Sequence, residues 1–323
     1  MKLSILDQVP VFKGASAKEA IKASLDLAEM ADQLGFARYW VAEHHDMKRF
    51  ACPAPDIILG LIGSRTEKIK IGAGAVLLPH YRPFHIAERY NLLATLYPRR
   101  IDVGIGRAPG GSAEATIALS GNFLKNVRNV SADIDELLAF FKQTFAKDHL
   151  YAKIAPTPVP NSPPDLWLLG TSEKSAKLAA EKDMSYVFGH FMTEKDGPAI
   201  VKQYRQQAKG KVIVAVSVIC AETYEQAKKL TEIALFENIE LEEAEEHYST
   251  ATQRTMESNV SNKDGALPEK LKTPFIFGNP LQVYEQLQAL QAIYQADEIM
   301  ILTNIPDYEI RKNSYQLIAQ TCL

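Results

Sequence analysis

Short apolar segments alternate with amphipathic segments along most of the chain. The apolar segments are rich in β-branched and aromatic residues on both faces, as are the buried strands of a parallel sheet. The segments between them repeat apolar residues at helical spacing, so each predicts a helix that packs one face on that sheet. The expected strands are Leu3 to Leu6, Arg38 to Ala42, Ile69 to Leu77, Ile101 to Ile105, Asp165 to Leu169, Ser185 to Phe188, Lys211 to Ala221 and Glu298 to Leu302.

The stretch from Ile69 to Gly111 shows this pattern most clearly. Its first strand is followed by Pro83, which can start a helix without losing a hydrogen-bond donor, and Pro98 ends that helix. The second strand ends in Gly104-Ile105-Gly106-Arg107. A strand, a crossover helix and a strand form one βαβ unit, and glycines at strand ends let the backbone pass close to a ligand.

Helices are expected between nearly all of these strands. The helix after the first strand is predicted to begin at the N-cap Ser16 and to end at Gly35. The other helices are expected at Asp56 to Ser64, Ile134 to Phe145, Ser172 to Glu181, Glu194 to Ala208, from Tyr224 onward, at Pro280 to Ile293 and at Tyr308 to Ile318.

Eight strands that alternate with helices favour a (β/α)8 TIM barrel, formed as a single domain by residues 1–323. Two segments lack the pattern and are expected to be insertions, about 108–131 after strand four and about 238–273 after strand seven. The alternative is an open doubly wound sheet. Against it, the glycines at 104 and 106 break the G-x-G-x-x-G spacing and follow the fourth strand, not the first.

Composition narrows the class of protein. The 323 residues are 46% hydrophobic and 23% charged, which is ordinary for a globular chain. The formal net charge of -3 gives no general attraction to nucleic acid or acidic membranes. The three cysteines are too few and too scattered for a disulfide framework or a metal cluster, and the chain shows neither a signal peptide nor a transmembrane run. We therefore expect a cytoplasmic protein with no membrane or nucleic-acid partner.

Polar residues follow many of the predicted strands. In a barrel the carboxyl ends of all strands lie on one face, which is where function is usually located. The residues expected on this face are His44, His45, Gly74 to His80, Gly104 to Arg107, Gly170 to Ser172, Gly189, His190 and Asn304.

One group on this face is typical of an anion site. Gly170, Thr171 and Ser172 lead from a strand into a helix, whose free N–H groups and positive dipole end attract a phosphate. Arg107 follows the neighbouring strand and can bind phosphate through two hydrogen bonds. The simpler alternative is that Ser172 only caps the helix.

The histidines on this face are candidates for acid–base work or hydrogen bonding. His44 and His45 directly follow a buried strand, where adjacent side chains diverge, so they are not expected to chelate one metal ion. The alternative is that one is buried under a loop and the other exposed. His190 also lies at a strand end, where a helix-capping role is equally compatible with the sequence. No zinc-type Cys/His spacing and no G-x-S-x-G elbow is present.

These motifs together resemble the bacterial-luciferase-like flavin-dependent monooxygenases over essentially the whole chain. The resemblance is carried by Gly35-Phe36, Tyr39 to His45, Ile71 to His80, Arg99 to Arg107 and Trp167 to Ser172. Ala108-Pro109-Gly110 and Ala296 to Met300 resemble the branch of single-chain bacterial oxidoreductases. Gly106 and Gly110 replace a cysteine and a tyrosine of the light-emitting members, so light emission is not expected.

The resemblance implies a barrel that binds reduced FMN at its carboxyl face. The flavin phosphate would meet Arg107, Ser172 and Ser175, with Gly170, Thr171 and His190 also at the cofactor. The isoalloxazine would lie against Gly74 and Ala75, where the family often has a non-prolyl cis peptide. His44, with His45 beside it, would be the catalytic histidine, and the segment 238–273 would correspond to the family's lid.

The function implied is that of an FMN-dependent monooxygenase. Reduced FMN from a separate flavin reductase would react with O2, and a small organic substrate would be oxygenated. A homodimer is expected in preference to an obligate heterodimer of two different chains. The alternatives are a non-catalytic flavin-binding protein, a deazaflavin-dependent dehydrogenase on the same barrel, and a barrel lyase or isomerase that acts on a phosphorylated metabolite.

Overall fold

A closed ring of parallel strands forms the centre of the molecule. The computed structural model describes residues 1–236 and 275–323. Eight of the described strands close in the order β1-β2-β3-β4-β5-β6-β7-β9, which confirms the predicted (β/α)8 TIM barrel. The described strands are β1 (Leu3–Asp7), β2 (Arg38–Val41), β3 (Lys70–Leu77), β4 (Ile101–Gly106), β5 (Asp165–Gly170), β6 (Ser185–Gly189), β7 (Val212–Cys220), β8 (Phe275–Gly278) and β9 (Glu298–Leu302).

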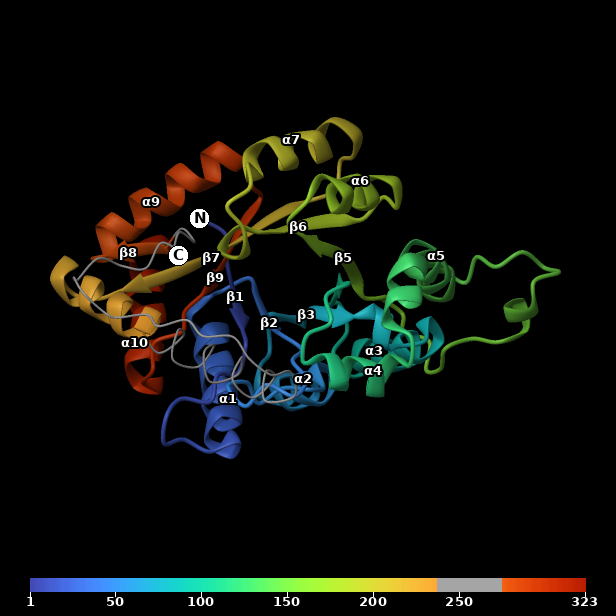
Figure 1. Cartoon of the computed structure of the whole chain (residues 1–323), viewed down its shortest axis with the longest axis horizontal. Coiled ribbons are helices and arrows are strands. Elements are labelled where there is room, and N and C mark those ends of the chain that lie inside the picture. The colour runs from blue at the N-terminus through green and yellow to red at the C-terminus, as the bar shows by residue number, and fades with distance from the viewer. Residues whose placement is uncertain (237–274) are drawn as a thin grey trace, which may run out of the picture.

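The helices lie outside the strands (Figure 1). They are α1 (Ala17–Leu34), α2 (Pro55–Arg65), α3 (Pro83–Leu96), α4 (Ala113–Ser120), α5 (Phe123–Lys142), α6 (Glu173–Glu181), α7 (Gly197–Gln207), α9 (Pro280–Tyr294) and α10 (Tyr308–Cys322), and residues 224–236 are also helical. Helix α1 begins at Ser16, which forms a capping box with Glu19, and it ends at the left-handed Gly35, both as predicted. No helix in residues 1–236 or 275–323 combines the length and hydropathy that a membrane span requires.

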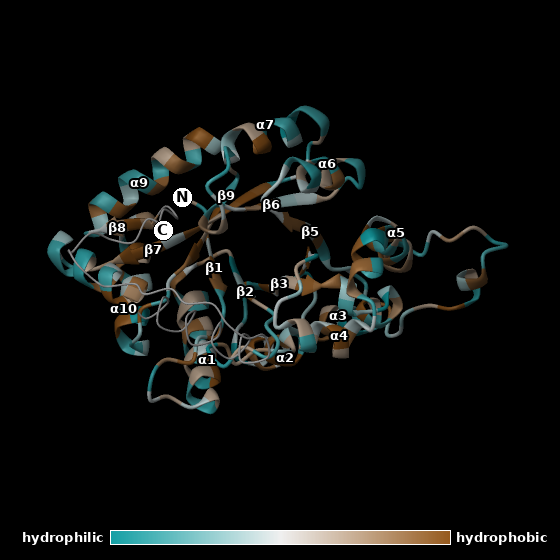
Figure 2. Ribbon diagram, viewed as in Figure 1, coloured by the Kyte–Doolittle hydropathy of each residue, from teal (hydrophilic) through white to brown (hydrophobic). Residues whose placement is uncertain are grey.

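The strands are largely hydrophobic (Figure 2), and their residues divide between two core clusters. Their outer faces pack against the helices in the larger core cluster. The inner faces from strands around the ring form a second cluster, whose members are Leu6, Trp40, Ala42, Trp167, Val187, Ile213, Ala215 and Met300. The rings of Trp40 and Trp167 meet edge to face with centroids 5.8 Å apart, so the barrel interior is filled.

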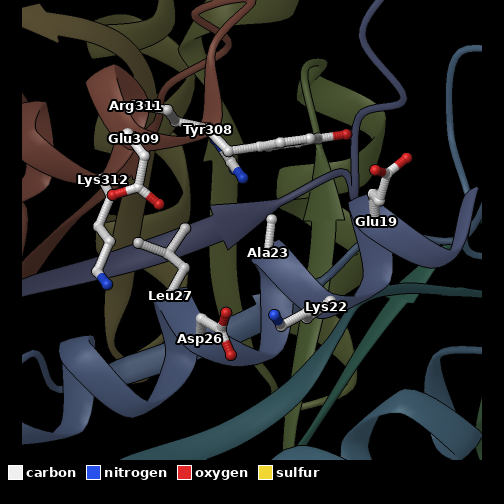
Figure 3. A pocket seen from close by; sticks show the side chains of 9 residues that line it. All are labelled: Glu19, Lys22, Ala23, Asp26, Leu27, Tyr308, Glu309, Arg311 and Lys312. Atoms are coloured by element: carbon white, nitrogen blue, oxygen red, sulfur yellow. The ribbon is translucent and has the colours of Figure 1, made fainter. Parts of the chain in front are cut away.

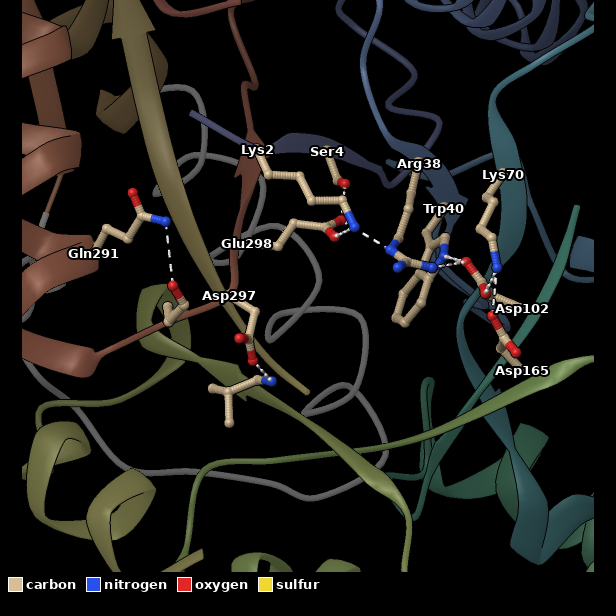
Figure 4. Close-up of polar contacts among 12 residues, drawn as sticks. Lys2, Ser4, Arg38, Trp40, Lys70, Asp102, Asp165, Gln291, Asp297 and Glu298 are labelled. Atoms are coloured by element: carbon tan, nitrogen blue, oxygen red, sulfur yellow. Dashed lines mark hydrogen bonds and ion pairs between the residues drawn. The ribbon is translucent and has the colours of Figure 1, made fainter. Parts of the chain in front are cut away.

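The amino end of the barrel is closed by buried charges (Figure 4). The Arg38 guanidinium donates to Asp102 Oδ2 at 2.7 Å and to Glu298 Oε1 at 2.8 Å, which joins β2, β4 and β9. Burial raises the pKa of Asp102 against the opposing effects of Arg38 and Lys70. This layer separates the carboxyl face of the barrel from the solvent at the opposite end.

Two differences from the expected elements stand out. The strand β8 (Phe275–Gly278) was not expected; it pairs with the carboxyl half of β7 beyond the closed ring. Helix α5 begins at Phe123 instead of Ile134, because Asn122 caps it and its first two turns are mostly exposed and need no apolar stripe. The insertion at about 108–131 therefore contains α4 and the start of α5. The segment 238–273 lies outside the described residues.

Candidate functional site

The predicted site residues gather on an arc of five neighbouring strands. The strands β2, β3, β4, β5 and β6 follow one another in the ring, and all run in the same direction. At their carboxyl ends lie, in this order, His44 and His45, Gly74 and Ala75, Arg107, Gly170 to Ser175, and His190. The ring closure therefore places residues from far apart in the sequence on one side of one barrel mouth.

The backbones of β3 and β4 come close together within this arc. The Gly74–Ala75 peptide bond is cis, as the resemblance implies. A Cβ atom at Gly106 would lie 3.0 Å from the Ala75 Cβ, so a larger side chain at position 106 would push on the cis peptide. The small residues therefore let the two backbones pack closely, and of the three only Gly74 is partly exposed.

A buried carboxylate fixes the end of β2 against the end of β3. Glu43 accepts hydrogen bonds from the Leu77 N–H at 3.2 Å and from the Tyr81 hydroxyl at 2.7 Å. His45 Nε2 pairs with the same carboxylate at 2.8 Å. The His45 backbone N–H also donates to the Gly110 carbonyl. His45 is thus held in an internal network with its Nε2 occupied.

His44 has a different environment, as expected for adjacent side chains. Its ring stacks on Phe50 with centroids 4.1 Å apart, and its buried Nδ1 has no hydrogen-bond partner among the described residues. Burial, with smaller contributions from Arg49 and His45, lowers the pKa of His44 to about 4. The imidazole is therefore neutral near pH 7 and retains one buried nitrogen that could still form a hydrogen bond.

The start of α6 and the end of β4 share a small pocket. It is lined by Ile105, Gly106, Arg107, Val130, Leu168, Leu169, Ser175 and Leu178. Ser172 caps α6 and forms a reciprocal capping box with Ser175, so both hydroxyls are fixed at the helix N-terminus. The exposed Arg107 supplies a guanidinium at the same pocket. A cation, a hydroxyl and a helix N-terminus form the donor set that a phosphate needs.

Thr171 and His190 lie at the far end of the arc. The Thr171 methyl group would be 3.3 Å from a Cβ at Gly189, so the ends of β5 and β6 are close. His190 Nδ1 pairs with the Tyr294 hydroxyl of α9 at 2.8 Å, and burial lowers the pKa of His190. One nitrogen of His190 is thus engaged by the scaffold. In the described residues, no group of three or more His, Cys, Asp or Glu side chains is arranged to hold a metal ion.

A larger groove lies outside the barrel, between α1 and α10 (Figure 3). Its polar lining has both charge signs, with Lys22 and Lys312 alongside Asp26 and Glu309. Its most buried charge, Arg311, is already paired with Asp7 at 2.8 Å. This groove contains none of the predicted site residues, and its charges of both signs do not favour one kind of ligand. The arc at the barrel mouth is therefore the better candidate site.

Sequence reasoning assigned no role to two residues of this region. Glu43 precedes the histidine pair, but only the fold shows that it anchors His45 and the end of β3. Tyr186 lies inside the apolar strand Ser185–Gly189, where its ring is indistinguishable from core. Its hydroxyl reaches Ser175 at 2.9 Å, a contact that no sequence pattern indicates.

Solved structures with the same fold cover nearly the entire chain. The crystal structure of apo-MsnO8 matches with a TM-score of 0.87 and 29% identity, covering 99% of this chain and 98% of that one. The oxygenating constituent of 3,6-diketocamphane monooxygenase from Pseudomonas putida, solved in complex with FMN, matches with a TM-score of 0.72. At 19% identity over 100% of this chain and 98% of that one, it shows likeness of fold alone.

Sequence relatives are also similar from end to end. The N-acetyl-S-alkylcysteine monooxygenase of Bacillus subtilis is 32% identical, covering 100% of this chain and 98% of that protein. A luciferase-like monooxygenase of Escherichia coli is 31% identical, covering 97% of this chain and 95% of that protein. The family model described as luciferase-like monooxygenase matches residues 1–295. With this match and the barrel itself, the chain belongs to the luciferase-like monooxygenase family.

Proposed function

We propose that this protein is an FMN-dependent monooxygenase, which oxygenates a small organic molecule with reduced FMN and O2. The observation that carries the proposal is the arc at the carboxyl ends of β2 to β5. It places the neutral His44, the Gly74–Ala75 backbone and the Arg107–Ser175 pocket along adjacent strands of one barrel mouth. A hydrogen-bonding group, a closely packed backbone of small residues and an anion site in one row suit the reacting edge, the ring and the phosphate of FMN.

The residues of the arc fit the cofactor by their chemistry. Arg107, Ser175 and the N-terminus of α6 offer positive charge and N–H or O–H donors to the phosphate. The small residues 74, 75 and 106 let the ends of β3 and β4 pack closely, and we propose that the ring system lies against this backbone. The buried Nδ1 of His44 has no partner among the described residues, which fits a site that a ligand completes. When bound, reduced FMN would supply the two electrons that activate O2.

The chain itself would position the reactants and exclude water. His44, neutral near pH 7, would hold or move a proton at the reacting end of the site. Trp40 and Trp167 fill the interior beneath the mouth, so bound molecules would rest on packed side chains. The hydrogen bonds that Glu43 accepts from Leu77 and Tyr81 would hold the end of β2 in place, and with it the backbone that carries His44.

The substrate is proposed to have an apolar portion. Leu169 and Phe191 are partly buried and pack on the interior apolar cluster. The name of the relative from Bacillus subtilis makes N-acetylated, S-alkylated cysteines the first compounds to screen. We further propose that a separate flavin reductase supplies the reduced cofactor.

The test is an anaerobic titration with reduced FMN, reduced riboflavin and reduced deazaflavin F420. We expect saturable binding of FMN. Arg107→Ala should weaken this binding about tenfold or more, because it removes a charge-assisted hydrogen bond to the phosphate. Arg99→Ala is the matched control, because Arg99 is also exposed but precedes the amino end of the same strand. Its FMN affinity should equal that of the wild type.

Oxygen uptake by the FMN-loaded protein then separates an enzyme from a flavin-binding protein. His44→Asn should change the rate of oxygen consumption and leave flavin affinity within a few-fold. Failure of FMN to saturate the protein, or binding indifferent to Arg107→Ala, would refute the assignment. Binding of FMN with oxygen chemistry unaffected by His44→Asn would reduce the protein to a carrier.

A further inference from the structure

Tyr186 connects the middle of β6 to the N-terminus of α6. Its ring is fully buried between the strand and the helices, and it packs on Tyr204 with centroids 5.4 Å apart. Its hydroxyl lies 2.9 Å from Ser175 Oγ. A Cβ at Gly170 would lie 3.6 Å from this hydroxyl and 2.3 Å from Ser175 Oγ, so the three residues are closely packed at the anion pocket.

Hydrogen-bond accounting at Ser175 fixes the direction of this contact. A serine hydroxyl has one proton and two lone pairs. Ser175 Oγ donates its proton to the Ser172 carbonyl at 2.6 Å and accepts the Ser172 N–H at 3.1 Å. The remaining lone pair has two hydroxyls within reach, that of Tyr186 at 2.9 Å and that of Ser172 at 3.3 Å. Because the Tyr186 contact is the shorter, we infer that the tyrosine is the donor. Burial raises the pKa of Tyr186 to about 12, against the effects of Ser175, Arg107 and Ser172, so its proton stays in place at working pH.

This arrangement determines what Ser175 can offer to a ligand. Both of its lone pairs are occupied by donors from the protein, and only its proton can be redirected, from the Ser172 carbonyl to a molecule in the pocket. Ser175 is therefore able to donate to an incoming oxygen and unable to accept from it. Such a hydroxyl favours an anion that carries no protons of its own, and Arg107 at the same pocket favours the same partner.

We propose that Tyr186 is a positioning residue that makes Ser175 an obligate donor to the phosphate of the flavin, so that the protein distinguishes FMN from riboflavin. The inference rests on the proposed function, since it assumes that a flavin occupies the barrel mouth. Tyr186 need not touch the cofactor. It acts through Ser175, because its hydroxyl donates to a lone pair of Ser175 Oγ. Without this bond, the Ser175 hydroxyl could rotate or could accept a hydrogen bond from a ligand.

The matched pair of variants is Tyr186→Phe and Tyr204→Phe. Both remove one hydroxyl from a buried tyrosine in the same layer, but the Tyr204 hydroxyl donates to the Met184 carbonyl, away from the pocket. Affinities for reduced FMN and reduced riboflavin are measured anaerobically for each protein. Tyr186→Phe should lose about tenfold in FMN affinity and keep its riboflavin affinity. A tenfold loss is the size expected for one hydrogen bond that orients a donor to a charged phosphate. Tyr204→Phe should leave the ratio of the two affinities unchanged.

Ser175→Ala and the double variant show whether Tyr186 acts through Ser175. If it does, Tyr186→Phe costs FMN affinity in the wild type and nothing further in Ser175→Ala. Additive losses, equal losses for both flavins, or an unchanged ratio in Tyr186→Phe would each overturn the inference while leaving the proposed function intact. A wild type that binds neither flavin would overturn both. Riboflavin affinity and the thermal midpoint show that each variant is folded.

Discussion

Individual residues at the barrel mouth differ more in environment than in type. His44 and His45 are adjacent, yet His45 Nε2 is held by Glu43, whereas His44 is stacked on Phe50 with a buried, unpaired Nδ1 within the described structure. The low pKa of His44 follows from the cost of burying its charged form. Burial, with smaller contributions from Arg49 and His45, thus keeps this imidazole neutral near pH 7.

This burial makes stability depend on pH. The pKa of His44 is about 4 when folded, against an ordinary value of 6.5, so between these pH values the unfolded chain binds a proton that the folded chain does not. Stability should therefore fall as the pH is lowered from 6.5 toward 4. His44→Asn removes this effect, and its free energy of unfolding should improve relative to the wild type by about 2 kcal/mol between pH 7 and pH 4.5.

Urea unfolding of both proteins across this pH range measures the difference between their free energies of unfolding. All other titrating groups are the same in the two proteins, so their effects cancel. Curves for the two proteins that stay parallel between pH 7 and pH 4.5 would show that His44 is not held neutral by burial.

The sequence predicts which residues lie at the barrel mouth, but it does not predict which residues they contact. Arg107 and Ser172 could be predicted as an anion site, because a helix start and a cation at neighbouring strand ends have a direct physical meaning. Glu43 and Tyr186 could not be assigned roles. Their contacts join segments 34 and 11 residues apart, and only ring closure and packing bring those segments together.

Among the elements, α2 and α3 have an unusual surface. They pack side by side and are linked by the Asp56–Arg89 ion pair at 3.2 Å. Each also exposes two large apolar side chains one turn apart, Ile57 and Leu61 on α2 and Leu92 and Leu96 on α3. Between Asp56 and Ser64, helix α2 carries apolar residues or glycine at every position, on its exposed side as well as its buried side, as is typical of a helix covered by a partner.

We propose that the protein is the homodimer expected from its sequence, with this face covered by a second copy of the chain. Leu61→Lys combined with Leu92→Lys should convert the dimer to a monomer, because two buried ammonium groups on each side cannot be desolvated at low cost. Leu281→Lys, at a comparably exposed leucine of α9, is the matched control and should remain dimeric. Sedimentation gives the masses. A monomeric wild type, or a double variant that stays dimeric, would contradict this expectation.

The expected and observed elements differ where local pattern is weak. Strand β8 (Phe275–Gly278) has only four residues and follows a segment with no clear period, so nothing local marks it as strand. The first turns of α5 contain few buried residues, and their apolar residues do not form a continuous stripe along the helix. By contrast, the capping box at Ser16 and the Gly35 terminus of α1 are local signals, and both ends of that helix could be predicted.

At the scale of the whole molecule, the barrel depends on the charge layer at its amino end. Arg38 is the cation between Asp102 and Glu298, and both carboxylates are buried. Arg38→Met should lower the free energy of unfolding by about 3–5 kcal/mol, because it leaves the buried carboxylates of Asp102 and Glu298 with only their partly exposed lysine partners. Lys2→Met, which removes the half-exposed partner of Glu298, should cost no more than about 1 kcal/mol. Equal losses in urea unfolding would show that the layer is not held by Arg38.

The central claim is that the carboxyl-end arc of β2 to β5 is a flavin site, and a crystal structure of the protein soaked with FMN tests it most directly. The account predicts phosphate density between Arg107 and the first turn of α6, within hydrogen-bond distance of Ser175, and ring density beside the Gly74–Ala75 peptide with His44 at its edge. FMN bound in the groove between α1 and α10, or a phosphate that makes no contact with Arg107 and Ser175, would contradict it.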